Sequence, residues 1–264
     1  MFLRNTIIAL ALLITLNAQA GVSFSNSRIF IDDKNSKQDF LLFNRGETSE
    51  TCDISLIDYD VDINGVLTPL DADQKSENSA KPYVRFSPKR MIMQPQQTQK
   101  VKIIARGYKS AQTNELHSYL SISCKESTTS ASNATVPDQS NSQYKAAQII
   151  PTFVNRIPII IRKKQVPVNI DFSNIKFSTK DDFTFVDFTL LRDGDRSIYG
   201  TFKLLDEDGK QIAIRGGVSS YVQSPATQQQ LKFKSSNSQT FTLSYKEDPK
   251  FGGTESKSMV ISKP

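Results

Sequence analysis

Few residues in this sequence have the types and spacing that catalysis requires. His117 is the only histidine among 264 residues, and it lies within the alternating stretch "HSYLSIS", which is typical of a strand. A Ser-His-Asp site needs an exposed histidine beside a nucleophile. The chain contains no Gly-x-Ser-x-Gly elbow and no phosphate-binding loop. We therefore predict that the protein is not an enzyme and needs no cofactor.

The two cysteines, Cys52 and Cys124, are the other residues with reactive side chains. Together with one histidine they are too few for the usual four-ligand zinc site, so we predict no metal centre. In an oxidising compartment the default for two cysteines is a disulfide, and a pair of buried free thiols is the alternative. A disulfide between them would close a loop of 72 residues and stabilise the fold by on the order of 4 kcal/mol.

The N-terminus predicts that the chain reaches such a compartment. "MFLRNTIIALALLITLNAQA" combines a basic residue, an apolar run and small residues at Ala18 and Ala20, which is the pattern of a secretory signal peptide. We expect residues 1–20 to be removed by cleavage after Ala20. The apolar run is too short for an ordinary transmembrane helix, and an uncleaved anchor is the alternative. We expect the cleaved chain to be exported and not to insert stably into a membrane.

The remaining sequence alternates with a period of two nearly everywhere, which predicts an all-β protein. Short β-branched or aromatic runs such as "QDFLLFNRG" and "QKVKIIARG" are separated by turn residues such as Asn64-Gly65. We expect a seven-strand immunoglobulin-like sandwich over residues 21–162 and a second β-sandwich over residues 163–264, joined by a short hinge at 163–167. The formal net charge is +6, but the basic residues are scattered, so we predict no nucleic-acid partner.

Two adjoining segments of the first domain differ from this pattern. Residues 125–147 are rich in Ser, Thr, Asn and Gln and almost lack large apolar side chains, which predicts a mobile loop. Residues 148–162 then read "QIIPTFVNRIPIIIR", a long apolar strand. Its two prolines favour an edge position, because proline in a central strand removes a ladder hydrogen bond. The alternative is a last strand that is buried on both faces.

The side chains of this strand divide into two sets on its opposite faces. One set holds Ile149, Pro151, Phe153, Asn155 and Ile157, and the other holds Ile150, Thr152, Val154, Arg156 and Pro158. We expect the second set to face the domain's own core. A slip of one residue in register would exchange the two sets.

Several stretches together resemble the PapD-like family of periplasmic pilus-assembly chaperones. They are "SRIFID", "RFSPKRMIMQPQQTQKVKIIARG", "NELHSYLSI", "RIPIIIRK" and "GDRSIYGTFKLLD", in the family's order over nearly the whole exported chain. The "EL-H-SYL" pattern and the Tyr-Gly pair resemble the non-classical (archaic-type) branch. The resemblance implies two immunoglobulin-like domains in a boomerang arrangement and a location in the periplasm.

The resemblance also implies a function. Such a chaperone binds pilus (fimbrial) subunits by donor-strand complementation and delivers them to an outer-membrane usher. An edge strand of the chaperone fills the groove of a subunit that lacks its last strand, and it supplies both backbone hydrogen bonds and apolar side chains. The residues implied for this role are Ile149, Pro151, Phe153 and Ile157. The main alternative function is that of a two-domain periplasmic binding protein, or of an adhesin or structural pilus protein.

Two further sets of residues follow from the resemblance. The client's C-terminal carboxylate is expected to bind two basic residues, the first of which matches Arg28. The second matches Pro158 here, so Arg156 is the nearest substitute; Lys89 and Arg90 are further candidates, although an exposed turn is the simpler interpretation of both. The family's buried interdomain ion pairs match Glu115, Arg162 and Asp248, with unrelated surface charges as the alternative.

Overall fold

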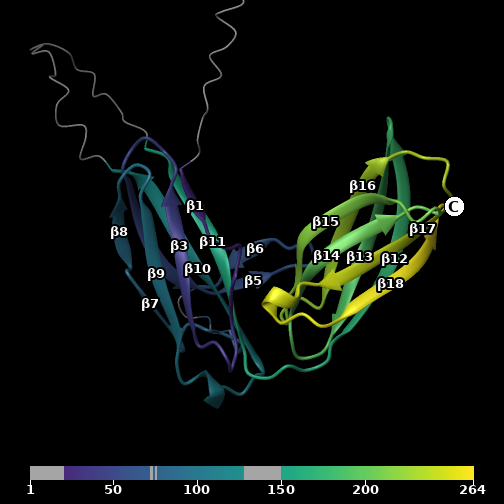
Figure 1. Ribbon diagram of the computed structural model, residues 1–264. Helices are drawn as coiled ribbons and strands as arrows, with labels where there is room; N and C mark the ends of the chain where they lie inside the picture. Colours follow the sequence, from purple (N-terminus) through teal and green to yellow (C-terminus); the bar gives the residue numbers. More distant parts are fainter. Residues whose placement is uncertain (1–20, 72–73, 75, 128–149) are drawn as a thin grey trace, which may run out of the picture.

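The computed structural model describes residues 21–71, 74, 76–127 and 150–264, which form two β-sandwich domains joined by a short connection (Figure 1). The two domains diverge from that connection, as the predicted boomerang arrangement requires (Figure 1). The predicted signal peptide, residues 1–20, lies outside the described residues, and so does Ile149. Among the described residues, no helix is long and apolar enough to span a bilayer.

Nine strands of the first domain form the two sheets of its sandwich. The first sheet has the order β1 (Val22–Phe24), β3 (Lys37–Asn44), β9 (Thr98–Ala105) and β7 (Val84–Ser87). The second has the order β2 (Ile29–Ile31), β11 (Thr152–Arg162), β10 (Glu115–Glu126), β4 (Glu50–Ile57) and β8 (Arg90–Met93). The expected number of seven is wrong, because two extended stretches, 22–31 and 84–93, each change sheets and so contribute two short strands.

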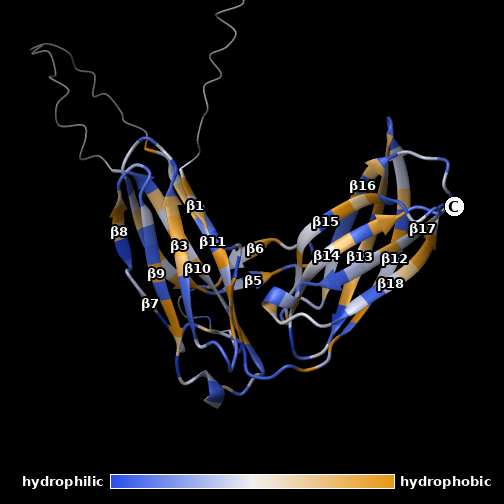
Figure 2. Ribbon diagram, viewed as in Figure 1, coloured by the Kyte–Doolittle hydropathy of each residue, from blue (hydrophilic) through white to orange (hydrophobic). Residues whose placement is uncertain are grey.

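The core lies between these two sheets and consists of every second residue along the long strands (Figure 2). Phe40 and Leu42 of β3, and Val101 and Ile103 of β9, are all almost fully buried. Their neighbours in the sequence are polar or partly exposed, which is the alternation expected of a sandwich with one solvated face.

The second domain is also a two-sheet sandwich, and its core is rich in phenylalanine. One sheet has the order β12 (Asn169–Lys180), β13 (Phe183–Asp193) and β16 (Ala226–Lys234). The other has the order β15 (Gln211–Ser220), β14 (Ile198–Leu205), β17 (Thr240–Glu247) and β18 (Ser256–Ser262). The predicted fold class, two immunoglobulin-like sandwiches joined by a short hinge, is confirmed.

A small hairpin of the first domain reaches across to the second. It consists of β5 (Tyr59–Val61) and β6 (Leu67–Pro69), and its turn contains the predicted Asn64-Gly65 pair. The backbone N–H of Gln228 donates to the carbonyl of Ile63 at 2.9 Å. Val61 also packs with Ile160 and Tyr221 in a small core of its own. The hairpin therefore forms a second connection between the domains, besides the covalent one.

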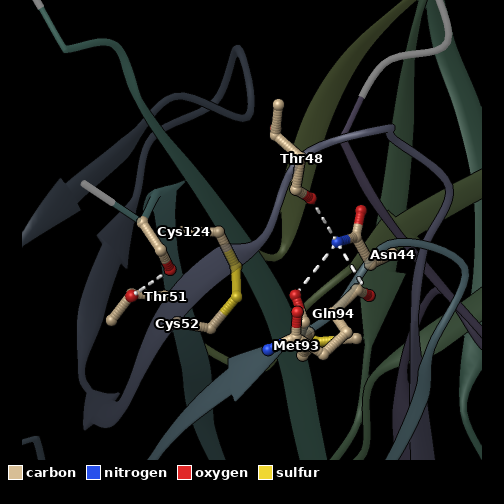
Figure 3. Close-up of a disulfide and its surroundings, with 8 residues drawn as sticks. Asn44, Thr48, Thr51, Cys52, Met93, Gln94 and Cys124 are labelled. Atoms are coloured by element: carbon tan, nitrogen blue, oxygen red, sulfur yellow. Dashed lines mark hydrogen bonds between the residues drawn. A yellow bond between two sulfur atoms is a disulfide. The ribbon is translucent and has the colours of Figure 1, made fainter. Parts of the chain in front are cut away.

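The two cysteines form a disulfide between neighbouring strands. Cys52 of β4 lies directly opposite Cys124 of β10, with Cα atoms 4.1 Å apart, and no free cysteine remains among the described residues. The predicted disulfide is confirmed. Beside it, the Asn44 side chain donates to the carbonyls of Thr48, Met93 and Gln94 and so joins the two sheets at this end of the domain (Figure 3).

The predicted start of the mobile loop is wrong. Lys125 and Glu126 belong to β10, where they lie opposite Thr51 and Glu50 of β4. Ser127 is buried, and its hydroxyl shares a hydrogen bond of 2.6 Å with that of Thr51. The backbone groups of Lys125 and Glu126 form hydrogen bonds with β4, and such pairing does not depend on the apolar side chains that this segment lacks. The rest of the predicted segment, up to residue 147, lies outside the described residues.

Removing the disulfide should weaken the first domain. We expect the variant that combines Cys52→Ala with Cys124→Ala to lose about 4 kcal/mol of free energy of unfolding, because the bond closes a loop of 72 residues in the unfolded chain. Urea-induced unfolding of the variant and of the oxidised wild type measures the difference. Equal unfolding midpoints and equal slopes for the two proteins would contradict this expectation.

Candidate functional site: an open strand edge beside an arginine-lined cleft

The first half of β11 is an open sheet edge. Along its whole length, from Thr152 to Arg162, β11 pairs with β10. On its other side it pairs with β2 only at Ile159–Ile161. Residues 152–158 therefore have no strand partner on that side among the described residues, and their outward backbone groups are free to pair with another chain.

This open edge carries exposed apolar side chains. Phe153 is 62% exposed and Val154 is 45% exposed, whereas Ile157 and the residues after it are buried. Long apolar edge strands favour aggregation, and soluble proteins usually cover or charge them. An edge of this kind is a candidate surface for the addition of a strand from another chain.

The register shows which side chains face the interior of the sandwich. Phe153, Asn155 and Ile157 lie opposite Cys124, Ile122 and Leu120, whose side chains belong to the core. The expectation that the other set faces the core is therefore wrong. Pairing with β10 decides which set turns inward, and a sequence pattern of period two fits either choice. Pro151 is exposed and immediately precedes the strand.

The sandwich is open between this edge and β1. Gly21 and Val22 of the first sheet, together with Phe153 and Asn155 of the second, line a cavity of about 190 Å³. Glu50 also lines it, and burial together with the nearby Glu126 raises the pKa of the Glu50 carboxyl. A strand placed here could pair with β11 and cover Phe153 at the same time.

Arg28 lies in the cleft next to this edge, immediately before β2. Its side chain is almost buried, and its guanidinium carbon is 3.3 Å from the ring centroid of Tyr199 in the second domain. Its Nη2 donates to the hydroxyl of Ser219 at 2.7 Å, while its buried Nε has no partner. No carboxylate of the described residues forms a salt bridge with it. A buried guanidinium without a counter-charge is costly, so Arg28 is well suited to bind an incoming carboxylate.

Arg156 lies on the cleft-facing side of β11, with Pro158 on the same face. Its Nε donates to the hydroxyl of Tyr59 at 2.7 Å, which holds an otherwise exposed side chain in place. Lys89 and Arg90 lie far from Arg28 and Arg156 in the sheet. Arg90 lies in β8, at the opposite end of the sheet from β2, and Lys89 immediately precedes it. The structure therefore brings Arg28 and Arg156 to the cleft and excludes the other two.

Buried aromatic rings of both domains pack together beside Arg156, whose Nε donates to Tyr59. Tyr59 packs edge-on against Tyr119, with ring centroids 5.1 Å apart. His117 stacks on Tyr221 of the second domain at 4.2 Å. We call Tyr59, His117, Tyr119 and Tyr221 the aromatic cluster. It provides an apolar floor for whatever lies between the two positive charges.

The environment of His117 keeps its imidazole neutral. Burial lowers the pKa of His117 to about 3, and the positive charge of Arg28 acts in the same direction. Its Nε2 has no hydrogen-bond partner among the described residues. The described residues also contain no group of three or more His, Cys, Asp or Glu side chains that could hold a metal ion. His117 therefore acts here as a packing residue of the cleft.

Glu115 and Arg162 form a buried ion pair at the hinge. They lie opposite each other at the ends of β10 and β11, with Arg162 Nη2 2.8 Å from Glu115 Oε2. Both contact the second domain through one residue: Ser197 N–H donates to Glu115 Oε1, and Arg162 Nη2 donates to the Ser197 carbonyl, each at 2.9 Å. The pair therefore fixes the position of the second domain relative to the ends of β10 and β11.

The assignment of Asp248 to this network is wrong. Its carboxylate accepts the backbone N–H of Lys250 at 2.9 Å and so caps the short turn η3 (Pro249–Phe251). The preceding residue, Glu247, is the acid that is buried, and it binds Arg196 through two bonds of 2.7 and 2.8 Å. Successive residues at the end of a strand point to opposite faces. The prediction was one position too late, so it chose the outward carboxylate of Asp248 and not the buried one of Glu247.

No role in the site was predicted from the sequence for several of its residues. Arg196, Tyr199 and Ser219 belong to the second domain, and Tyr59 to the hairpin. Each acquires its role through a contact with a distant part of the chain. The residue type of Gly252 was the one available signal, because glycine often marks a position that no other residue can occupy. In the structure its φ is +70°, and a Cβ there would lie 2.7 Å from the Phe30 ring.

Breaking the ion pair at the hinge should be costly. We expect Glu115→Gln to lower the free energy of unfolding by about 3 kcal/mol, because Arg162 would remain buried without a counter-charge. Asp248→Asn is the matched control, and we expect it to cost less than about 1 kcal/mol, as for the loss of a cap. Urea unfolding of the two variants decides, and equal losses would contradict the assignment.

The low pKa of His117 predicts a loss of stability in acid. As the pH falls below 6.5, the unfolded chain binds a proton that the folded protein does not bind until about pH 3. The imidazole should therefore remove about 2 kcal/mol of free energy of unfolding between pH 7 and pH 5. Comparing urea unfolding of the wild type with that of His117→Phe at the two pH values isolates this contribution. Equal losses in both proteins would contradict it.

The arrangement of the two domains has counterparts among known structures. The structure of the YadV chaperone aligns with 92% of this chain and 100% of its own, with a TM-score of 0.51 and 10% sequence identity. A structure of the Salmonella enterica SafA pilin in complex with the SafB chaperone aligns with 92% of this chain and 97% of its own, with a TM-score of 0.47 and 12% identity.

The E. coli chaperone DraB aligns with 90% of this chain and 96% of its own, with a TM-score of 0.46 and 10% identity. No protein-family model matches the sequence, and no curated protein matches it. At 10% identity the similarity to YadV concerns the fold. The chain therefore has the two-domain β-sandwich fold of the YadV chaperone.

Proposed function

We propose that this protein is a periplasmic chaperone that binds pilus subunits by donor-strand complementation and delivers them to an outer-membrane usher. The observation that carries the proposal is the open edge of β11, with Phe153 exposed on its inward face, next to a cleft that holds Arg28 without a carboxylate partner. The fold shared with a chaperone is consistent with this role.

The edge supplies what an incomplete sandwich lacks. A subunit without its last strand exposes backbone groups on two neighbouring strands and an apolar groove between its sheets. Residues 152–158 offer free backbone groups, and Phe153 and Ile157 are side chains of the inward set. Ile149 and Pro151 would extend the donor strand at its start. Asn155 is a polar member of the same set, so we expect the client to carry a polar group opposite it.

The cleft supplies the anchor that sets the register. A C-terminal carboxylate of the client would bind Arg28, replacing the contact with Ser219, and Arg156 would add a second positive charge across the aromatic cluster. Because the anchor and the edge strand belong to the same sheet, binding the terminus fixes which client residues lie opposite Phe153. The ion pair of Glu115 and Arg162 holds the cleft at a constant width.

The anchor is tested by co-production with an exported subunit encoded next to this protein's gene. We expect a soluble one-to-one complex that is recovered by affinity purification. Arg28→Ala should weaken it by at least about 30-fold, as for the loss of one partner of a desolvated charge pair. Arg106→Ala, which removes an exposed arginine of the same domain, is the matched control. An unchanged complex for Arg28→Ala would exclude Arg28 as the anchor.

The donor strand is tested with the same complex. Phe153→Asp should weaken binding by about 10- to 100-fold, because a buried aromatic contributes about 1.5–3 kcal/mol. Ile92→Asp is the control, since Ile92 is 55% exposed on β8 at the other end of the same sheet. If both variants bind as well as the wild type, the client does not use β11. If no subunit binds the wild type, the role of a structural or adhesive protein is favoured instead.

A further inference from the structure

The first domain has a second open corner, between β4 and β7. In Figure 1, β7 lies on the side of the first domain that faces away from the second domain. The corner forms a groove of about 450 Å³. Ile54, Leu56, Val84 and Phe86 line it, together with three basic residues. We call this the β4–β7 groove.

One wall of the β4–β7 groove is a free strand edge. β8 covers the edge of β4 only from Glu50 to Asp53, after which the Ile54 N–H donates to the Lys89 carbonyl at 2.7 Å. Backbone groups of alternate residues point to the same side of a strand, so those of Leu56 point towards the groove as well. No strand of the described residues pairs with Leu56 on that side.

The floor of the groove is apolar. Ile54 and Val84 are buried in the core, while Leu56 and Phe86 pack against it and remain partly exposed. All four are core-facing side chains of the two sheets. Leu56 and Phe86 remain partly exposed because no strand of the described residues covers them at this corner. An added strand would bury them as core residues are buried elsewhere in the domain.

The rim of the groove is basic. Lys81, Arg85 and Lys89 are all exposed, and no acidic residue lines the groove. Two acids lie near this rim: Asp58, whose Oδ2 is 3.8 Å from Lys81 Nζ, and Asp53, whose Oδ1 is 3.5 Å from Nε of Arg90. The corner at β11 has the opposite character, because Glu50 and Glu126 lie opposite each other there.

From these observations we propose that the β4–β7 groove binds an extended acidic segment of a partner protein. The segment adds as a strand to the free edge of β4, pairs with the backbone of Leu56 and places an apolar side chain between Leu56 and Phe86. Its acidic residues then lie next to Lys81 and Lys89. This is strand addition, in which the backbone provides affinity and the side-chain pattern provides specificity.

Charge decides between the two corners of the domain. An acidic strand is attracted to the three cations of the β4–β7 groove and repelled by the two carboxylates near β11. The proposed segment therefore occupies a surface separate from the donor strand, and both can be occupied at once. The proposal does not depend on the chaperone function.

The test uses a fluorescein-labelled heptapeptide of alternating glutamate and valine, with the exported chain and fluorescence anisotropy at low salt. We expect saturable binding that Lys89→Glu weakens at least about tenfold, because it replaces an attraction by a repulsion. Lys109→Glu makes the same change of charge at another exposed lysine of the domain and should leave the affinity within about twofold. The matching peptide of lysine and valine should bind this groove at least about tenfold more weakly.

Two further measurements separate strand addition from simple charge attraction. Methylating the backbone nitrogens of the three valines removes hydrogen-bond donors without changing charge, and it should abolish binding if the peptide pairs with β4. Phe153→Asp should leave the affinity unchanged, which separates this groove from the β11 edge. The proposal is overturned if the wild type does not bind the acidic peptide, if Lys89→Glu and Lys109→Glu weaken binding equally, or if the methylated peptide binds as well as the parent.

Discussion

The pairing of β10 with β11 is the constraint on which the rest of this structure depends. One antiparallel register, from Glu115 opposite Arg162 to Lys125 opposite Thr152, places three different features at once. At one end it forms the buried ion pair that contacts the second domain. In the middle it turns Arg156 towards the cleft. At the other end it leaves Phe153 on an inward face that no strand covers. A slip by one residue would reverse all three.

Buried charge gives the junction between the domains its character. Arg162 and Arg196 are each matched by a glutamate, at 2.8 and 2.7 Å. Arg28 has no such partner, and it relies on the face of Tyr199 and on the hydroxyl of Ser219. Matched pairs specify geometry and add little net stability. An unmatched charge at the same junction instead provides free energy for binding an anion, which is why the cleft is suited to a carboxylate.

The first domain leaves two of its strand edges partly uncovered. Most soluble sandwiches cover or charge the strands at their corners. Here the corner at β11 remains apolar with carboxylates nearby, and the corner at β4 and β7 remains apolar with cations at its rim. Under the two proposals, the opposite charges of these corners would direct two different extended chains to two separate surfaces of one small domain. The disulfide between Cys52 and Cys124 lies on the shared sheet and supports both.

The sequence by itself determined the all-β class, the two sandwiches and the unusual strand after residue 148, because these depend on local alternation and composition. It made a disulfide the default for Cys52 and Cys124, and the structure excluded the alternative of free thiols. The sequence did not determine which face of that strand turns inward, since a pattern of period two fits both registers equally. It also assigned Asp248 to a network that uses Glu247. Only the tertiary structure decided these points, together with the roles of Arg196, Tyr199 and Ser219, because each depends on contacts between residues far apart in the chain. Burial and charge pairing depend on which residues meet in the folded chain, and the residues next to each position in the sequence do not show this.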